Sequence, residues 1–202
     1  MWDNGHMSSI DRIRGHFEDS SKLILDTAES LSAPISQAAN QILQCLMSDG
    51  KVLACGNGGS AATAQKWVSG MVNRFELERP GLAAIALTTD TSILTAIAND
   101  YAYNQVFSRQ VSALGQPGDV LLAISTSGNS ESVVRAAQAA RKREMSVIVL
   151  TGQDGGNLAE QMTDNDVLIC VPADNTARIQ EIHLLIIHCL CDVVDSVLLG
   201  VA

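Results

Sequence analysis

Aromatic residues are scarce in this chain, at 3% of 202 residues, and there are only four prolines. Apolar residues as a whole reach 47%, so a buried core must be built mainly from aliphatic side chains and alanine. Basic residues are also few: 13 Lys and Arg against 22 Asp and Glu give a formal net charge of −9. Direct nucleic-acid binding needs a basic surface that displaces counterions, so the composition argues against it.

Long apolar runs and a secretory signal are missing as well. No uninterrupted stretch reaches the roughly 18 apolar residues of a membrane span, and residues 11–26 are amphipathic and charged. The cysteines are odd in number, and their spacing suits neither a disulfide framework nor a common zinc site; they are Cys45, Cys55, Cys170, Cys189 and Cys191. We expect free thiols in a reducing cytoplasm, and no membrane partner.

The chain reads as one domain over residues 8–202, after a vector-derived remnant at residues 1–7. Residues 8–48 form a helical part: helices are expected over 11–31 and 35–47, with Pro34 as a break or a first turn. Over residues 49–202 strand and helix signals alternate, which predicts a parallel sheet with helices on both faces. Strands are expected at 51–55, 82–87, 120–124, 146–150 and 167–171, and helices at 61–73, 92–99, 104–114, 130–142 and 177–199.

Two junctions between a strand and a helix carry the chemical signal. The first expected strand runs into Gly56–Ser60, a Gly-Asn-Gly-Gly-Ser segment, and directly on into a helix. Such a junction aims backbone N–H groups and a helix N-terminus at one spot, which favours an anion, although a plain turn has the same composition. The segment is neither a Walker loop nor a G-x-G-x-x-G motif, so a nucleotide is not the first expectation.

The second junction, Ser125–Ser130, places four hydroxyls within six residues at the end of another strand. Ser and Thr gather at turns and helix caps, so any one of them is unremarkable as a ligand. In open α/β sheets, however, ligands bind outside the carboxyl ends of the strands. Two such segments predict a phosphorylated small molecule that is held from two sides.

Five motifs together resemble the sugar isomerase (SIS) family, over about residues 11–199. They are Cys-Gly-Asn-Gly-Gly-Ser at 55–60, Ala-Asn-Asp at 98–100, Ile-Ser-Thr-Ser-Gly-Asn-Ser at 124–130, Leu-Thr-Gly-x-Asp-Gly-Gly at 150–156 and Ala-Arg-Ile-Gln-Glu-Ile-His at 177–183. Within the family, the sedoheptulose-7-phosphate isomerases (GmhA) and the DnaA initiator-associating proteins (DiaA) look equally near. The resemblance implies a three-layer α/β/α sandwich with a five-stranded parallel sheet. It also implies a homotetramer, with the terminal helices at its interfaces.

The resemblance further implies a phosphosugar site shared between subunits. The residues that would bind the phosphosugar are Asn57, Gly58, Gly59, Ser60, Ser125, Thr126, Ser127, Ser130 and Gln180. In the isomerase group, a Glu on the first helix is the base and a His on the last helix is its partner. A zinc ion is held there by a His and that Glu, four residues apart, and by a Gln and the last-helix His.

This chain departs from the isomerase pattern at two positions. Lys66 stands in the place of the zinc-binding His, and Gly70 in the place of the Glu. A lysine is protonated near neutral pH and repels a divalent cation, and glycine cannot transfer a proton. Only Gln180 and His188 of the metal set remain. We therefore expect no metal cofactor, with zinc required only if the chain is an isomerase after all.

These losses favour a DiaA-like scaffold without catalysis, which binds the basic initiator DnaA and promotes chromosome replication. Leu198 and Leu199 are the candidate partner contact, with tetramer packing as the alternative. The alternative function is a sedoheptulose-7-phosphate isomerase of lipopolysaccharide heptose synthesis, and a phosphosugar-sensing regulator is a third. As an isomerase, the chain would use His188 for proton transfer, unless that residue is a core or interface histidine. Asp100 would polarise a sugar hydroxyl, or merely close a turn.

Overall fold

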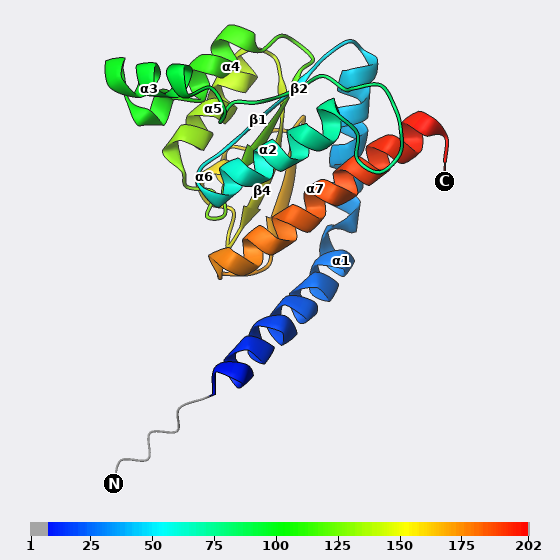
Figure 1. Cartoon of the computed structure of the whole chain (residues 1–202). Helices are drawn as coiled ribbons and strands as arrows, with labels where there is room; N and C mark the ends of the chain where they lie inside the picture. Colours follow the sequence, from blue (N-terminus) through cyan, green and yellow to red (C-terminus); the bar gives the residue numbers. More distant parts are fainter. Residues whose placement is uncertain (1–7, 202) are drawn as a thin grey trace.

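A computed structural model describes residues 8–201, and the interpretation of residues 1–7 as a vector remnant lies outside the described residues. Five parallel strands form one sheet in the order β2-β1-β3-β4-β5 (Figure 1). Their bounds are β1 Val52–Gly56, β2 Ala84–Ala86, β3 Val120–Ile124, β4 Ser146–Gly152 and β5 Val167–Val171. The chain leaves β1 toward β2 and returns to β3 on the other side of β1, so the strand order reverses at β1 and β3. A crevice at the carboxyl ends of two such strands is the usual ligand site of an open α/β sheet.

Helices cover both faces of the sheet, which confirms the predicted α/β/α sandwich. One face carries α1 (Ser9–Met47), α2 (Gly59–Val72) and α7 (Thr176–Leu199). The other face carries α3 (Thr91–Asp100), α4 (Ser108–Leu114), α5 (Glu131–Lys142) and α6 (Gly156–Glu160), with a 3-10 turn at Tyr103–Gln105. The short α6 has no counterpart among the expected helices.

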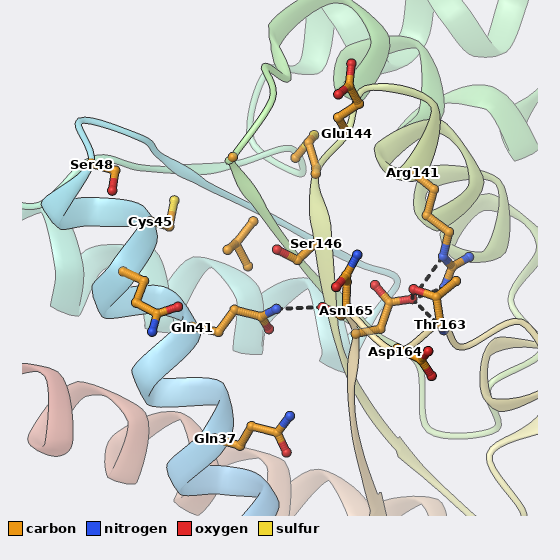
Figure 2. Close-up of a pocket in the computed structure, with 15 residues that line it drawn as sticks. Gln37, Gln41, Cys45, Ser48, Arg141, Glu144, Ser146, Thr163, Asp164 and Asn165 are labelled. Carbon is orange, nitrogen blue, oxygen red and sulfur yellow. Dashed lines mark hydrogen bonds and ion pairs between the residues drawn. The ribbon is translucent and has the colours of Figure 1, made fainter.

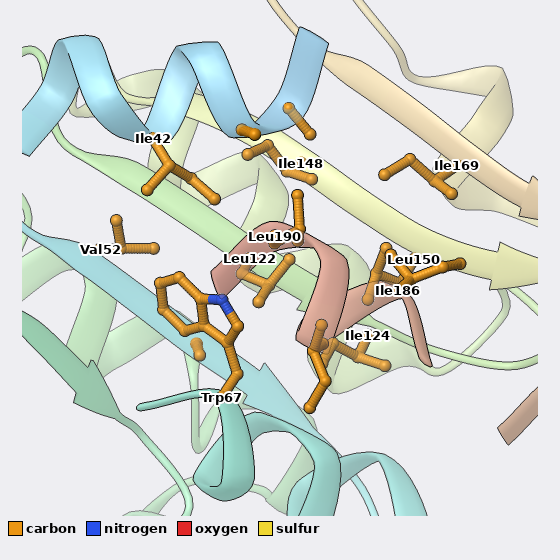
Figure 3. Close-up of a cluster of buried hydrophobic side chains, with 14 of the residues drawn as sticks. Ile42, Val52, Trp67, Leu122, Ile124, Ile148, Leu150, Ile169, Ile186 and Leu190 are labelled. Carbon is orange, nitrogen blue, oxygen red and sulfur yellow. The ribbon is translucent and has the colours of Figure 1, made fainter. Parts of the chain in front are cut away.

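Each strand contributes alternate side chains to two separate cores, as the period of two along a strand requires. Val52 of β1 faces the core under α1, α2 and α7, whereas Leu53 faces the core under α4 and α5. Trp67 of α2 lies in the first core near Leu122 and Leu190, with only 1% of its surface exposed (Figure 3). This burial fixes the orientation of α2, and with it the backbone position of the neighbouring residue, Lys66, whose side chain is exposed.

The expected break at Pro34 is wrong, because α1 runs without interruption from Ser9 to Met47. A proline inside a helix costs about 3 kcal/mol, since it removes one backbone hydrogen bond. The helix continues because it buries side chains on both sides of the proline, Leu31 before it and Ala38 after it. The N-terminal turns of α1 extend beyond the sheet (Figure 1) and expose Ile13 and Phe17.

The last helix, α7, is apolar nearly all round, and by length and composition it could cross a membrane. Core helices pass the same test, and α7 packs against α1 and α2 in the structure. Its buried side chains include Ile182, Ile186 and Leu190. Its apolar character is therefore explained in large part by packing within the domain.

Candidate functional site

The two polar loops meet at the reversal of strand order. Gly56 at the end of β1 lies beside Ile124 at the end of β3, so the segments that follow them are neighbours. One leads into the N-terminus of α2 and the other into the N-terminus of α5. Both helix N-termini therefore border the same crevice, where their backbone N–H groups favour an anion.

Asn57 ties the first loop to the second. Its amide nitrogen donates a hydrogen bond of 2.9 Å to Ser132 Oγ on α5, and its amide oxygen accepts one of 2.8 Å from the hydroxyl of Tyr103. The Ser125 hydroxyl donates to Ser130 Oγ at 3.2 Å, and Ser60 and Ser125 are both buried. No sequence pattern pointed to Tyr103, and Ser132 could have been found only as a further hydroxyl in the first turn of α5.

The turn between β4 and α6, with the first residues of α6, packs against the second loop and holds it by hydrogen bonds. Gly128 has a φ of +67°, and a Cβ atom there would lie 1.8 Å from the carbonyl oxygen of Gly155. The backbone N–H of Leu158 donates to Gly128 O at 3.0 Å, and that of Asn157 donates to Asn129 Oδ1 at 3.0 Å. This close backbone contact gives the glycines of the 150–156 motif a structural role.

Gln180, near the start of α7, lies directly against the first loop. A Cβ atom at Gly59 would come within 2.5 Å of Gln180 Nε2, so a larger residue there would displace this amide. Gln180 and Gly59 line a cavity of about 470 Å³ together with Thr63 and Lys66. The cavity thus connects the start of α2 with the start of α7.

A second cavity, of about 520 Å³, lies farther along the same two helices. It is lined by Lys66, Gly70, Phe75, His188 and Cys191, among others. The His188 ring is half-buried and lies against Phe75, with ring centroids 5.6 Å apart and planes inclined by 30°. Lys66 borders both cavities and is the side chain they share.

The residues present do not fit a zinc ion. Gln180 and His188 offer two donors, whereas Lys66 is a cation and Gly70 has no side chain. Burial is the main cause that raises the pKa of the neighbouring Cys191 thiol to about 12, against smaller opposing effects of Arg79 and Lys66. Cys191 therefore stays protonated, and a thiol is a poor metal ligand. Within residues 8–201, no three His, Cys, Asp or Glu side chains gather in a group that could hold a metal.

The other predicted site residues lie as follows. Thr126 and Ser127 are half-buried in the second loop, and Ser127 Oγ accepts the Asn129 backbone N–H at 3.2 Å. Asp100 is exposed at the end of α3, where its carboxylate accepts a hydrogen bond of 2.8 Å from Asn99. It belongs to neither cavity described above. Leu198 and Leu199 lie at the end of α7, each 38% exposed, and lie outside both cavities.

His183 and Glu181 have structural roles beside the site. Burial lowers the pKa of His183 to about 4, and its Nε2 lies 3.0 Å from Thr151 O at the end of β4. This ring is therefore neutral and links α7 to the sheet. Glu181 pairs with Arg178 at 2.6 Å, and accepts a hydrogen bond from Ser20 of α1 at 2.7 Å.

A larger cavity, of about 840 Å³, lies at the opposite end of the strands, near the start of β3 and β4 (Figure 2). Several of its polar side chains are already bonded within the protein. Gln41 donates to the Asn165 carbonyl at 2.7 Å, and Arg141 pairs with Asp166 at 2.9 Å. The two loops lie instead at the carboxyl ends of the strands, so we place the candidate site there.

Comparison with known proteins gives consistent results over nearly the whole chain. Residues 16–152 match the SIS domain family. The phosphoheptose isomerase of Thiobacillus denitrificans is 68% identical over 191 residues, which cover 95% of this chain and 97% of that protein. That of Azoarcus sp. is 62% identical over 195 residues, covering 96% and 99%.

Solved structures agree with these sequences. Phosphoheptose isomerase GmhA from Neisseria gonorrhoeae superposes with a TM-score of 0.90 at 53% identity, covering 94% of this chain and 100% of that chain. A phosphoheptose isomerase from Francisella tularensis gives a TM-score of 0.92 at 48% identity, with the same coverage.

These relatives overturn the expectation of a DiaA-like scaffold for DnaA in replication initiation. They also overturn the inclination toward a protein without enzymatic activity, because relatives of 62% and 68% identity carry the name of an enzyme. The expectation rested on Lys66 and Gly70, two positions of one helix, and gave too little weight to the rest of the chain. The alternative prediction, an isomerase, agrees better with the relatives.

Proposed function

Because the chain belongs to the SIS domain family, and within it to the phosphoheptose isomerases, we propose that it isomerises sedoheptulose 7-phosphate to the seven-carbon aldose phosphate. The observation that carries this proposal is the meeting of the two polar loops at the carboxyl ends of β1 and β3. Localisation in the cytoplasm is part of the proposal, since the substrate class is a metabolite of that compartment.

The phosphate is seated between the two helix N-termini. Ser60 and Ser125 offer hydroxyls there, and the backbone N–H groups at the start of α2 and α5 offer further donors. Hydrogen bonds to a charged phosphate are roughly twice as strong as neutral ones. Thr126, Ser127 and Ser130 complete the seat, while Asn57 holds the two loops together. From this seat the sugar extends along α2 toward Gln180 and Lys66.

His188 is the group that transfers the proton between the two sugar carbons. Histidine is the side chain most often used for this task near neutral pH. Its place in the second cavity, beside Lys66 and Gly70, supports this role. Gly70 offers no carboxylate, so His188 serves as both base and acid, and we expect turnover slower than in relatives that carry a Glu.

A homotetramer is part of the same proposal. The first turns of α1 expose Ile10, Ile13 and Phe17 at 63%, 56% and 72%, an apolar surface that a second chain would cover. The end of α7 exposes Leu198 and Leu199 in the same way. Light scattering on the purified full chain measures the mass of the particle directly. A monomer at working concentration would contradict the tetramer.

The test of the function is turnover of sedoheptulose 7-phosphate by the full chain, followed by separation of ketose and aldose phosphates. His188→Asn should lower kcat by about 10²–10⁴-fold, the usual contribution of a general acid–base group. His16→Asn, on the exposed part of α1, is the matched control: provided that light scattering shows an unchanged particle mass, it should leave kcat unchanged. Absence of turnover in the wild-type chain, with and without added zinc, would overturn the proposed function.

A further inference from the structure

We propose that Lys66 takes over the task of a divalent cation in this site, so that the chain binds and isomerises its sugar phosphate without metal. The inference rests on the proposed function and adds to it the group that stabilises the reacting oxygen. It follows from a disagreement: the fold family implies zinc, and the residues of this site cannot hold it.

The position of Lys66 suits this task. It lies on α2, six residues after Ser60, and borders both the cavity that contains Gln180 and the cavity that contains His188. Within the described chain, no Asp or Glu lies within ion-pair distance of its ammonium group. Its side chain is exposed and carries no carboxylate partner within residues 8–201, so its charge is available to a ligand in either cavity.

Three further features of the site agree with a lysine in place of a metal. A Cβ atom at Gly70 would lie 3.1 Å from Cys191 Sγ, so a side chain at this position fits only after a small shift of the thiol. Cys191 is itself buried. Gln180, the remaining amide, lies against Gly59, where it can bond a sugar hydroxyl as readily as a metal.

The reaction needs a positive charge beside the C2 oxygen of the sugar and one group that transfers protons. Lys66 and His188 supply the two. His188 removes a proton from C1 of the open-chain ketose, and the electron pair of that C–H bond forms the C1=C2 double bond. The C2 carbonyl oxygen gains the negative charge, which the Lys66 ammonium stabilises by a charge-assisted hydrogen bond. The proton of the C1 hydroxyl then moves to that oxygen, and His188 returns its proton to C2. Substrate and product have the same atoms, and no oxidant or reductant takes part.

The first experiment removes metal from the wild-type full chain with EDTA and measures both zinc content and turnover of sedoheptulose 7-phosphate. We expect well below one zinc per chain and unchanged turnover. Lys66→Met should lower kcat by about 10²–10³-fold, as loss of one such donor does in other enzymes. Lys142→Met, at the exposed end of α5, removes the same charge elsewhere and is the matched control. Loss of turnover with EDTA that zinc restores, or full activity of Lys66→Met, would overturn the inference.

The second experiment separates this inference from the proposed function. If the wild-type chain does not turn over the sugar, calorimetric binding replaces the activity readout. With EDTA present, Lys66→Met should weaken sedoheptulose 7-phosphate binding at least about tenfold and leave inorganic phosphate binding nearly unchanged. Equal affinity of the wild-type chain and Lys66→Met for the sugar phosphate, or sugar binding that requires zinc, overturns the inference.

A gain-of-site variant completes the test. The double substitution Lys66→His with Gly70→Glu places four donors on α2 and α7, together with Gln180 and His188. We expect it to bind one zinc per chain by calorimetry, whereas the wild-type chain binds none. A thermal melt checks that the variant is folded. Stoichiometric zinc on the wild-type chain, or no gain in the folded double variant, contradicts the proposed geometry.

Discussion

Arg79 and Asp195 form a buried ion pair, with 2.5 Å between Nε and Oδ1, that joins the segment before β2 to the last turns of α7. The same guanidinium donates hydrogen bonds of 2.8 Å to the carbonyl oxygens of Gly70 and Met71. One arginine therefore fixes both the end of α2 and the helix that carries His188. The geometry of the second cavity depends on this pair.

Asp195→Asn should lower the free energy of unfolding by about 3–5 kcal/mol, because it leaves the Arg79 charge buried without its partner. Urea unfolding followed by circular dichroism measures the loss. The control is Glu78→Gln, which breaks an exposed ion pair with Arg74 and should change stability little. Replacing both buried partners, as Arg79→Met with Asp195→Leu, should recover part of the loss. Equal stability of Asp195→Asn and the wild-type chain would show that the pair contributes nothing.

Gly59→Ala should weaken the binding of sedoheptulose 7-phosphate about tenfold, since the new methyl group displaces the Gln180 amide by direct overlap. Calorimetry measures the affinity. The contact itself is tested in the Gln180→Ala background, where the short side chain leaves space and Gly59→Ala should cost little further. Additive losses in the double variant would mean that the two residues act independently.

Ser60→Ala and Ser125→Ala should each weaken phosphate binding about tenfold or more, because each removes a hydrogen bond to a charged group. Inorganic phosphate should raise the melting temperature of the wild-type chain, and should do so less for both variants. Ser112→Ala, on the exposed face of α4, is the control and should respond like the wild-type chain. If phosphate raised the melting temperature of both loop variants as much as that of the wild-type chain, phosphate binding in this crevice would be contradicted.

His183 should make the folded chain sensitive to acid. Its pKa is about 4 in the folded chain and about 6.5 when unfolded, so between these values the unfolded state binds more protons and stability falls as the pH falls. Between pH 7.5 and pH 5 the expected loss is about 2 kcal/mol.

His183→Gln keeps a donor for Thr151 O and cannot titrate, so it should be less stable at pH 7.5 but lose less stability on acidification. Urea unfolding at both pH values gives the difference between the two chains. Parallel losses in the wild-type chain and in His183→Gln would contradict the assignment.

Much of the fold was predictable because the strands are short apolar runs between clear turn signals. The bounds of β3 and β5 agree with the expected ranges to the residue. The prediction of a break at Pro34 was wrong because only the local cost of a proline in a helix can be read from the sequence. The burial that offsets this cost depends on α7, which lies more than a hundred residues away in the chain. The short α6 was not predicted because it lacks the apolar periodicity that indicates a helix.

The site was predictable as two loops, but not as a set of contacts. The motifs indicated Ser60, Ser125 and Gln180 individually, whereas the packing of Gln180 on Gly59 needs the crossing of α2 and α7. Tyr103 lies in a 3-10 turn that no pattern marks. The prediction that Lys66 and Gly70 depart from the isomerase pattern stays a prediction, whereas the conclusion drawn from it, a scaffold without enzymatic activity, is overturned by the relatives.

The contact between Gly128 and Gly155 limits how this protein can evolve. Since a Cβ atom at position 128 would collide with the Gly155 backbone, a substitution there must displace one of the two turns. New substrates or new chemistry must then arise from the helices that border the cavities. Lys66 and Gly70 stand on such a helix, α2, and there they differ from the His and Glu that the resemblance to the isomerase group implies.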